Sequence, residues 1–313
     1  MKVLFVSSGN AKDGISPIVL NQGKSLINQG INIEFFTIKG KGFWSYFRHI
    51  IILRKYLKTN KFDIIHSHYS FTSYVAALAG ASPLVVSLMG SDLKSNGCAK
   101  LMTLFFYKFF WSQTIVKSME MYRCLDFKKT LLIPNGVNLG RFNSYDKKNC
   151  QVKLGWDNEK RHILFAADPG RAEKNYSLAQ MSIELLQSDY EIVVHILKDV
   201  PIEDIPIYIN AADVLILSSI YEGSPNVIKE AMASNCPIVT TNVGDVKWVL
   251  GNTDGCYISS FDPINYSEKI KSALEFSEKY GRTKGRDRII ELGLNSVTIA
   301  KKIIDVYQKV LST

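Results

Sequence analysis

Residues 218–241 read SSIYEGSPNVIKEAMASNCPIVTT, a pattern that predicts a loop, a helix and a strand. An apolar run at 213–217 precedes them and is typical of a buried parallel strand. The helix is expected to begin near Pro225, whose fixed φ suits a first helical turn, and to end before Pro237. A loop that leads from the carboxyl end of a parallel strand into a helix presents free N–H groups and the positive end of the helix dipole to an anion. The stretch therefore predicts a phosphate site.

Two carboxylates, Glu222 in the loop and Glu230 on the helix, frame this phosphate site. A carboxylate only accepts hydrogen bonds, so it repels a phosphate but can accept bonds from two neighbouring sugar hydroxyls. The arrangement suits a nucleotide-sugar. The alternative is that Glu222 interacts with the helix dipole and that Glu230 is a solvated surface residue. For an isolated pair of glutamates at this spacing, that alternative would be favoured.

The residues around the two glutamates extend the pattern, and they are Gly223, Pro225, the run 231–233, Pro237 and the pair 243–244. Together with Glu222 and Glu230 they resemble the donor-binding signature of the family 4 glycosyltransferases. The resemblance covers nearly the whole chain. It implies an α/β protein of GT-B fold, in which two Rossmann-like domains face each other across a cleft. It also implies transfer of a sugar with retention at the anomeric carbon.

By the same resemblance, the loop and the first helical turn bind the donor. The residues concerned are Gly223, Ser224, Pro225, Asn226 and Val227, with Glu222 against the transferred sugar and Glu230 on the ribose hydroxyls. Breaking the sugar–phosphate bond leaves negative charge on the departing diphosphate. Backbone N–H groups at the start of the helix would stabilise that charge.

The second half of the chain also supplies two cations in a strand-to-helix loop. A strand is expected at 162–167, and Arg171 and Lys174 follow it before a helix that begins at Tyr176. A guanidinium and an ammonium placed there can neutralise a departing diphosphate. The resembled family uses an Arg and a Lys of this loop in that way, so Arg171, Lys174 and Glu222 are the catalytic candidates. The alternative for either cation is a solvated loop side chain.

The chain begins as the first half of a Rossmann-like domain. A strand at 2–7, a loop that contains Gly14 and a helical pattern that ends at Gly30 open it. The glycines lack the spacing G-x-G-x-x-G, so a dinucleotide cofactor is not expected. In the resembled family the corresponding loop approaches the donor phosphates, and Gly14 is the nearest match.

Two further strands of the first half, 62–68 and 83–88, end in polar residues. The carboxyl ends of parallel strands collect at the edge of the sheet where ligands bind, so His68 and Asp92 are expected to line one cleft. The resembled enzymes use these loops for the acceptor and the transferred sugar. For His68, burial in the core is an equal alternative. Met89 stands where many members of the family carry a histidine.

Two stretches of the first half, 43–58 and 100–111, combine aromatic and basic residues. Each could lie in a membrane interface, with its rings at the headgroup boundary and its cations on anionic lipid. The alternative is a helix that covers the sheet. The second stretch is apolar nearly all round, so burial is the expectation there.

A turn at 134–136 and a polar stretch at 143–149 place the domain boundary near Asp146. We expect an acceptor-side domain over residues 1–146 and a donor-binding domain over residues 147–313. The resemblance further implies that the amphipathic C-terminal helix, at 294–307, packs back on the first domain.

Composition is that of a soluble globular protein. The 313 residues suffice for two domains, and no run of about twenty apolar residues predicts a membrane span. The five cysteines are scattered without a C-x2-C pair, which favours reduced thiols in a cytoplasmic protein. No carboxylate cluster suited to Mg²⁺ stands out, so neither a metal nor another cofactor is expected. The net charge of +9 predicts an anionic partner, either a phosphorylated substrate or an anionic membrane, and no nucleic-acid motif is present.

The motifs and the resemblance that they carry together imply a metal-independent, retaining glycosyltransferase of the hexosyltransferase type. The donor would be a nucleotide-diphosphate-sugar. The acceptor would be a saccharide or lipid-linked saccharide of cell-envelope or capsular polysaccharide synthesis, met at the cytoplasmic face of the membrane by peripheral contact. Two alternatives are a GT-B-like sugar-nucleotide epimerase or hydrolase, and a non-enzymatic basic protein that binds a membrane or nucleic acid.

Overall fold

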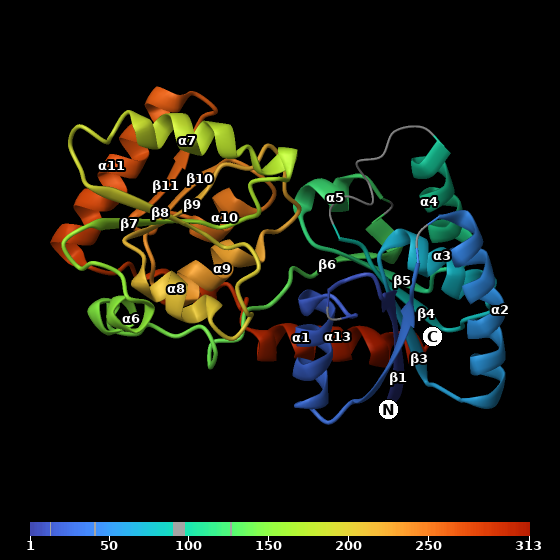
Figure 1. Ribbon diagram of the computed structural model, residues 1–313. Coiled ribbons are helices and arrows are strands. Elements are labelled where there is room, and N and C mark those ends of the chain that lie inside the picture. Colours follow the sequence, from blue (N-terminus) through green and yellow to red (C-terminus); the bar gives the residue numbers. More distant parts are fainter. Residues whose placement is uncertain (13, 41, 90–97, 126) are drawn as a thin grey trace. The chain divides into compact units, whose positions relative to one another are not determined.

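The computed structural model forms two α/β units and describes residues 1–12, 14–40, 42–89, 98–125 and 127–313 (Figure 1). Unit 1 comprises Met1–Gly136 and Ser296–Thr313, and unit 2 comprises Val137–Asn295. Each unit holds one parallel sheet whose strands are connected by helices, which confirms the predicted pair of Rossmann-like domains.

The sheet of unit 1 has the strand order β2-β1-β3-β4-β5-β6. Its strands are β1 (Lys2–Ser8), β2 (Asn32–Ile38), β3 (Ile64–His68), β4 (Leu84–Ser87), β5 (Gln113–Val116) and β6 (Thr130–Leu132). Its helices are α1 (Pro17–Ile27), α2 (Phe43–Thr59), α3 (Ser70–Leu78), α4 (Cys98–Phe109), α5 (Met119–Arg123) and α13 (Ser296–Leu311), with a 3₁₀ turn at Phe127–Lys129. The central strands are fully buried because helices cover both faces of the sheet.

The C-terminal helix α13 is part of unit 1, where it packs against α1. The hydroxyl of Tyr307 on α13 and the Nδ1 atom of His66 on β3 form a hydrogen bond of 2.6 Å. The second ring nitrogen of His66 is 2.8 Å from Ser87 Oγ. Both ring nitrogens are therefore satisfied within the protein, and His66 is a core residue that joins the helix to the sheet.

The sheet of unit 2 has the strand order β11-β10-β9-β7-β8. Its strands are β7 (Arg161–Phe165), β8 (Ile192–Ile196), β9 (Val214–Leu217), β10 (Ile238–Thr241) and β11 (Cys256–Ser259). Its helices are α6 (Lys147–Leu154), α7 (Tyr176–Glu184), α8 (Ile205–Ala211), α9 (Asn226–Ala233), α10 (Val246–Leu250), α11 (Pro263–Tyr280) and α12 (Gly285–Glu291), with a 3₁₀ turn at Ala172–Lys174. Strand β9, helix α9 and strand β10 reproduce the order predicted for residues 213–241.

The division between the units falls after Gly136, earlier than the predicted boundary near Asp146. The backbone N–H of Val137 donates to the carbonyl of Leu294 at 2.9 Å. Arg286 donates to two carbonyl oxygens of the following segment, at 2.8 and 2.9 Å. These bonds fasten the segment 137–142 to unit 2, and the backbone N–H of Tyr145, in the polar stretch that follows, donates to Asn210 Oδ1 at 2.8 Å. Polarity alone predicts a linker and does not reveal partners that are distant in the sequence.

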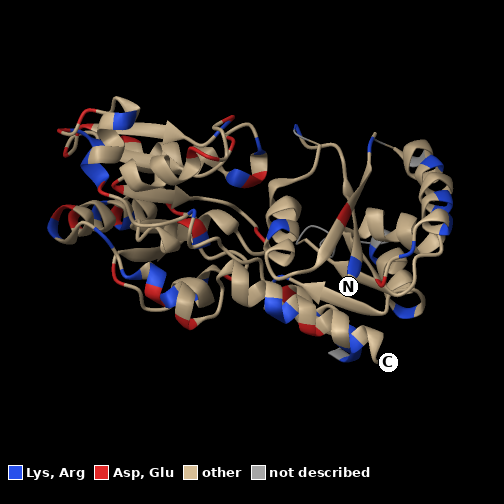
Figure 2. Cartoon of the chain, turned by 90° about the horizontal axis from the view of Figure 1, so that it is seen from below, with Lys and Arg blue, Asp and Glu red and all other residues tan. Residues whose placement is uncertain are grey.

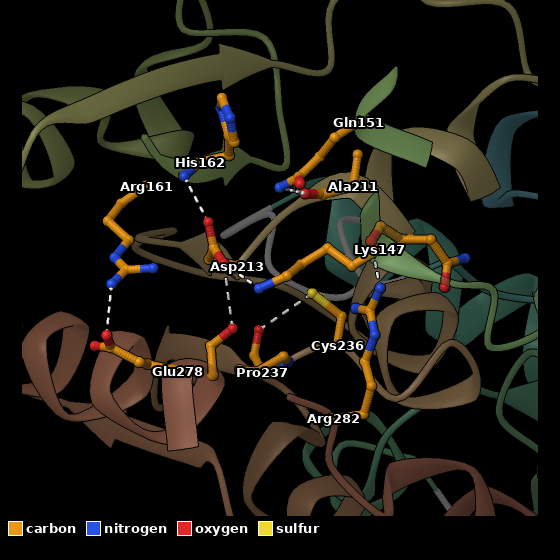
Figure 3. A network of polar contacts seen from close by, with 12 residues as sticks. Lys147, Gln151, Arg161, His162, Ala211, Asp213, Cys236, Pro237, Glu278 and Arg282 are labelled. Atoms are coloured by element: carbon orange, nitrogen blue, oxygen red, sulfur yellow. Dashed lines mark hydrogen bonds and ion pairs between the residues drawn. The ribbon is translucent and has the colours of Figure 1, made fainter. Parts of the chain in front are cut away.

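A buried carboxylate, Asp213, joins α6 and α11 to the amino end of β9 (Figure 3). It accepts hydrogen bonds from Lys147 Nζ at 2.6 Å, from the backbone N–H of His162 at 2.8 Å and from Ser277 Oγ at 3.3 Å. A charge at this depth is tolerated because all three donors reach it. The cluster lies at the amino edge of the sheet, opposite the edge where ligands bind, so its role is structural.

Replacing Asp213 by Ala should lower the free energy of unfolding by about 3 kcal/mol, because the change leaves the Lys147 ammonium and a buried N–H without their partner. Urea denaturation followed by circular dichroism measures it. The control is Asp189→Ala, which removes an exposed ion pair with Lys271 of 3.0 Å and should leave the urea midpoint nearly unchanged. Equal losses in the two variants would contradict this role for Asp213.

Helix α4 corrects the expectation that residues 100–111 are buried all round. Leu101, Phe105 and Phe109 recur every four residues and are exposed, whereas Phe106 and Tyr107 are buried against the sheet. The helix is therefore amphipathic, with an apolar outer stripe. Among the described residues, no helix is both long enough and apolar enough to cross a membrane.

Candidate active site

Two loops meet at the carboxyl edge of the sheet of unit 2, because β7 and β9 are hydrogen-bonded neighbours. The loop after β7 carries Lys174, and the loop after β9 carries Glu222. Ser218 Oγ, at the end of β9, donates to the carbonyl oxygens of Lys174 and Asn175, with both distances 2.9 Å. These bonds hold the first loop against the second.

Lys174 and Glu222, both predicted as catalytic, are in contact. Lys174 Nζ is bonded to Glu222 Oε1, and Ser219 Oγ donates to the same oxygen at 2.8 Å. Only 13% of the lysine side chain and 17% of the glutamate side chain are exposed. A hydrogen-bonded ion pair in this position is screened less by water than a surface pair is. The pair therefore places a positive charge and a hydroxyl acceptor together at one strand end.

Arg171 lies in the same loop as Lys174 but makes a different contact. Its Nε atom donates to Glu173 Oε1 at 2.8 Å, and more than half of its side chain is exposed. The backbone N–H of Glu173 and this guanidinium lower the pKa of the Glu173 carboxyl. The structure therefore brings Lys174 to Glu222 and leaves Arg171 at the rim.

Helix α9 begins at Asn226 with no side-chain cap, and Pro225 precedes it in an extended conformation. The first N–H groups of a helix lack partners inside the helix and are open to an anion here. Asn226 Oδ1 is buried and has no hydrogen-bond partner in the described part of the chain. The predicted donor residues Gly223, Ser224, Pro225, Asn226 and Val227 thus form one continuous turn into the helix, next to Glu222. We call residues 223–227 the donor turn, after their predicted role.

A buried lysine under this turn was not singled out from the sequence. Lys229 is 1% exposed, and its Nζ atom is bonded to Ser224 Oγ and lies 3.7 Å from Asp245 Oδ2. Ser224 Oγ in turn donates to Asp245 Oδ2 at 2.5 Å. Burial lowers the pKa of Lys229, and the nearby Asp245 carboxylate opposes that shift. The three side chains brace the donor turn against the segment that leads into α10.

Gly244 is the second support of the donor turn. Its φ of +57° favours glycine, and a Cβ built on it would overlap the carbonyl oxygen of Gly223 and lie 2.9 Å from the carbonyl carbon of that residue. The backbones of the two glycines therefore touch. No side chain fits at position 244 unless the Glu222–Gly223 turn moves.

Replacing Gly244 by Ala should weaken donor binding about tenfold, because the methyl group displaces the turn that carries Glu222. Calorimetric titration with the donor measures the change. Gly30→Ala is the matched control: Gly30 also has a positive φ, but it has no neighbouring atom within 4 Å and lies in unit 1. An unchanged donor affinity in Gly244→Ala would contradict the close packing of the turn.

Glu230 lies on α9 next to Lys229 and is partly buried. Burial raises the pKa of its carboxyl to about 7, and the charges of Arg141 and Lys229 oppose the rise. Its side chain makes no hydrogen bond or ion pair with another described residue. Arg141 Nη2 is also buried and unpartnered. The carboxylate is therefore available to hydroxyl donors from a ligand.

The remaining predicted residues belong to unit 1. Gly14 lies in the loop before α1, with a φ of +85° and open space around it. His68 is 0% exposed, and neither of its ring nitrogens has a hydrogen-bond partner among the residues that the structure describes; burial and then the Lys117 charge lower its pKa to about 3. This burial favours the core alternative for His68. Asp92 lies outside the described residues.

The described ranges contain no group of three or more His, Cys, Asp or Glu side chains arranged to hold a metal ion. The charges at the carboxyl edge of unit 2 include Lys174, Glu222, the Lys229–Asp245 pair and Glu230.

Comparison with known proteins matches two family models to the chain. A model described as glycosyl transferases group 1 matches residues 162–275, which include the Lys174, Glu222 and Glu230 positions. A model described as glycosyl transferase 4-like matches residues 11–116. The two ranges fall in different structural units and together take in more than two thirds of the chain.

Two relatives of the chain are named as glycosyltransferases. TuaC of Bacillus subtilis, a glycosyltransferase assigned to teichuronic acid biosynthesis, is 28% identical over 220 residues, which span 60% of this chain and 55% of that protein. UDP-Gal:alpha-D-GlcNAc-diphosphoundecaprenol alpha-1,3-galactosyltransferase of Escherichia coli is 24% identical over 305 residues, which span 83% of this chain and 79% of that protein.

Among solved structures, HepE of Anabaena in complex with UDP and glucose superposes with a TM-score of 0.77. The alignment covers 99% of this chain and 100% of that one at 15% identity, so the likeness concerns the fold. It confirms the predicted GT-B fold. The two family models, the named relatives and this fold agree, and the chain belongs to the group 1 glycosyltransferases.

Proposed function

We propose that the protein transfers a sugar from a nucleotide-diphosphate-sugar to a hydroxyl of a saccharide or lipid-linked saccharide, with retention at the anomeric carbon. The observation that carries the proposal is the contact between Lys174 and Glu222 beside the uncapped start of α9. A cation and open N–H groups suit the diphosphate, and a carboxylate suits the sugar.

The donor proposed first is a UDP-sugar. The E. coli relative is named for UDP-Gal, and HepE was solved with UDP and glucose. In this assignment Glu230 accepts hydrogen bonds from the ribose hydroxyls, the N–H groups of the 226–228 turn bind the diphosphate, and Glu222 binds the transferred sugar. The carboxylate of Glu230, which has no hydrogen-bond partner among the described residues, supports its assignment to the ribose hydroxyls.

The reaction breaks the bond between the anomeric carbon and the donor phosphate oxygen, and both electrons leave with the diphosphate. A bond to the acceptor oxygen forms on the same face of the sugar, and the proton of the acceptor hydroxyl passes to the departing diphosphate. Negative charge therefore grows on the diphosphate in the transition state, where a preplaced cation lowers the barrier most. Lys174 takes this role, and Arg171 assists it from the loop rim. In this mechanism the cations of the protein, and neither a metal ion nor another cofactor, balance the diphosphate charge.

The acceptor proposed is a lipid-linked saccharide of cell-envelope polysaccharide synthesis, used at the cytoplasmic face of the membrane. The name of the E. coli relative specifies a diphosphoundecaprenol-linked sugar, and TuaC is assigned to an envelope polymer. The basic composition of the chain suits both the diphosphate of such a lipid and an anionic membrane. Gly14 on the donor side and Asp92 on the acceptor side keep their predicted roles within this proposal, whereas the buried His68 is assigned to the core of unit 1.

The first experiment is a calorimetric titration of the protein with UDP, GDP, CDP and their common sugar derivatives. We expect one diphosphate series, the uridine one, to bind with a Kd on the order of 10 μM, about 7 kcal/mol of binding free energy. The bound donor is then incubated with lipid-linked and soluble saccharides, and the anomeric configuration of the product is determined by NMR. Binding of none of these nucleotides would refute the proposal. Consumption of the donor without an acceptor would identify a hydrolase or epimerase.

A further inference from the structure

The positive charge of the protein is concentrated in one structural unit. The residues of unit 1 include 20 Lys and Arg against 7 Asp and Glu, whereas those of unit 2 include 18 against 22. Unit 1 therefore carries a net charge of +13 and unit 2 a net charge of −4. An anionic partner much larger than a nucleotide would be drawn to unit 1.

Three helices of unit 1 cover the same face of its sheet. The chain steps in one direction across the sheet from β2 to β3, β4 and β5, so right-handed connections place α2, α3 and α4 on one side. Helix α2 packs on α3, and α3 packs on α4 (Figure 1). Because these helices run back against the strand direction, their first turns lie at the carboxyl edge of the sheet.

The outer surface of α2 and α4 is apolar and aromatic. We name it the basic aromatic face, formed by Trp44, Phe47, Ile51, Leu101, Phe105 and Phe109. The exposed fraction is 80% for Trp44, 71% for Leu101 and 63% for Phe109. Between the two helices, the exposed ring of Phe71 at the start of α3 packs on Tyr46, with 5.7 Å between ring centroids. Exposed apolar surface of this size, rimmed by charged residues, is typical of a protein or membrane interaction site.

The same two helices carry six cations and no carboxylate. The cations are Arg48, Arg54, Lys55, Lys58, Lys100 and Lys108. Figure 2 shows Lys and Arg, with no Asp or Glu, along the helix at the right edge, which is α2 by its place in Figure 1. Lys108 Nζ lies 5.4 Å from the ring centroid of Phe109, so a cation and an apolar ring share the surface.

We propose that the basic aromatic face docks unit 1 on an anionic lipid surface. The rings of α2 and α4 enter the boundary between headgroups and acyl chains, and their lysines and arginines contact the lipid phosphates. The inference rests on the proposed function for its purpose, because docking of unit 1 brings the predicted acceptor side of the protein to the membrane that would hold a lipid-linked acceptor. The chemistry of the face does not depend on that function.

The test is sedimentation of the whole protein with vesicles of phosphatidylcholine alone and with about 30% phosphatidylglycerol. We expect binding to the anionic vesicles only, and a loss of about tenfold or more in the partition coefficient for Leu101→Ser/Phe109→Ser and for Lys55→Glu/Lys58→Glu. The matched control is Val152→Ser/Ile264→Ser, which removes two side chains that are 67% and 62% exposed in unit 2 and should bind as the unchanged protein does.

A second readout follows one side chain of the face. Anionic vesicles should shift the tryptophan emission of the unchanged protein to shorter wavelength, and Trp44→Phe should abolish most of that shift, because Trp44 is the tryptophan on α2. Equal binding by the Leu101→Ser/Phe109→Ser variant and the control would overturn the proposal. So would a self-association that this variant abolishes, since the face would then bind a second copy.

Donor titrations on the same variants separate the two proposals. The docking variants should bind the donor as the unchanged protein does, because unit 2 is unaltered in them. Vesicle binding without any donor binding would refute the proposed function and leave the docking face standing. Donor binding without vesicle binding would refute the docking face and leave the proposed function standing.

Discussion

Replacing Lys174 by Met is expected to lower kcat/KM about 10²–10³-fold, because the ammonium that balances the departing diphosphate is removed from a part-buried site. The side chain is bonded to Glu222 and is held in place by the two bonds from Ser218 to its loop, so another cation does not readily substitute for it. Donor affinity should fall by only about tenfold, since much of the charge develops after binding. Steady-state kinetics and calorimetric titration with the donor give the two values.

Two controls define what Lys174 contributes. Lys198→Met removes an exposed ion pair with Asp168, 3.1 Å long, and should leave kcat/KM within about twofold. Arg171→Met should lower kcat/KM by about tenfold or less, because that side chain is largely exposed and pairs with Glu173. If Lys174→Met retained more than about a tenth of the kcat/KM of the unchanged protein, stabilisation of the leaving group would have to be assigned elsewhere.

The part of the site that local sequence order controls was predictable. The apolar run, the proline and the two glutamates of residues 213–241 specify a strand, a turn and a helix, and the structure has β9, the donor turn and α9 in that order. Lys174 and Glu222 were predicted to share one site, and they are in contact. Their contact depends on the pairing of β7 with β9, a strand order that the alternation of strands and helices does not by itself specify.

Long-range partners were not predictable. Lys229 follows an apolar residue on a helix, where a lysine normally reaches solvent, and only the fold brings it to Ser224 and Asp245. The polar composition of residues 143–149 predicted a linker. In the structure, hydrogen bonds of backbone groups tie the segment from Val137 onward to unit 2. For α4, an apolar composition indicated burial, whereas packing on one side of a sheet leaves the opposite stripe exposed. Each of these depends on contacts between residues far apart in the sequence.

Glu230→Gln is expected to remove most of the pH dependence of donor binding. Burial raises the pKa of this carboxyl from 4.5 to about 7, so it is mainly protonated at pH 6 and mainly ionised at pH 8. Only the ionised form offers two charged, unprotonated oxygens, one to accept a hydrogen bond from each ribose hydroxyl. Donor affinity should therefore rise about tenfold between pH 6 and pH 8 in the unchanged protein. In the variant it should be weak, roughly a hundredfold below the pH 8 value, and flat across this range.

The same substitution should have the opposite effect on stability. A folded-state pKa above the ordinary value means that the folded protein holds a proton which the unfolded chain releases near pH 4.5, so the carboxyl destabilises the fold as pH rises from 4.5 to about 7. Arg141 and Lys229, the charged groups that face it, reduce the effect. Glu230→Gln should thus be more stable at pH 8 by on the order of 1–3 kcal/mol and unchanged at pH 4, as measured by urea denaturation at the two pH values.

A variant that bound the donor weakly but gained no stability at pH 8 would show that Glu230 is solvated before the donor arrives. A variant that kept the pH slope of binding would place the titrating group elsewhere in the donor site.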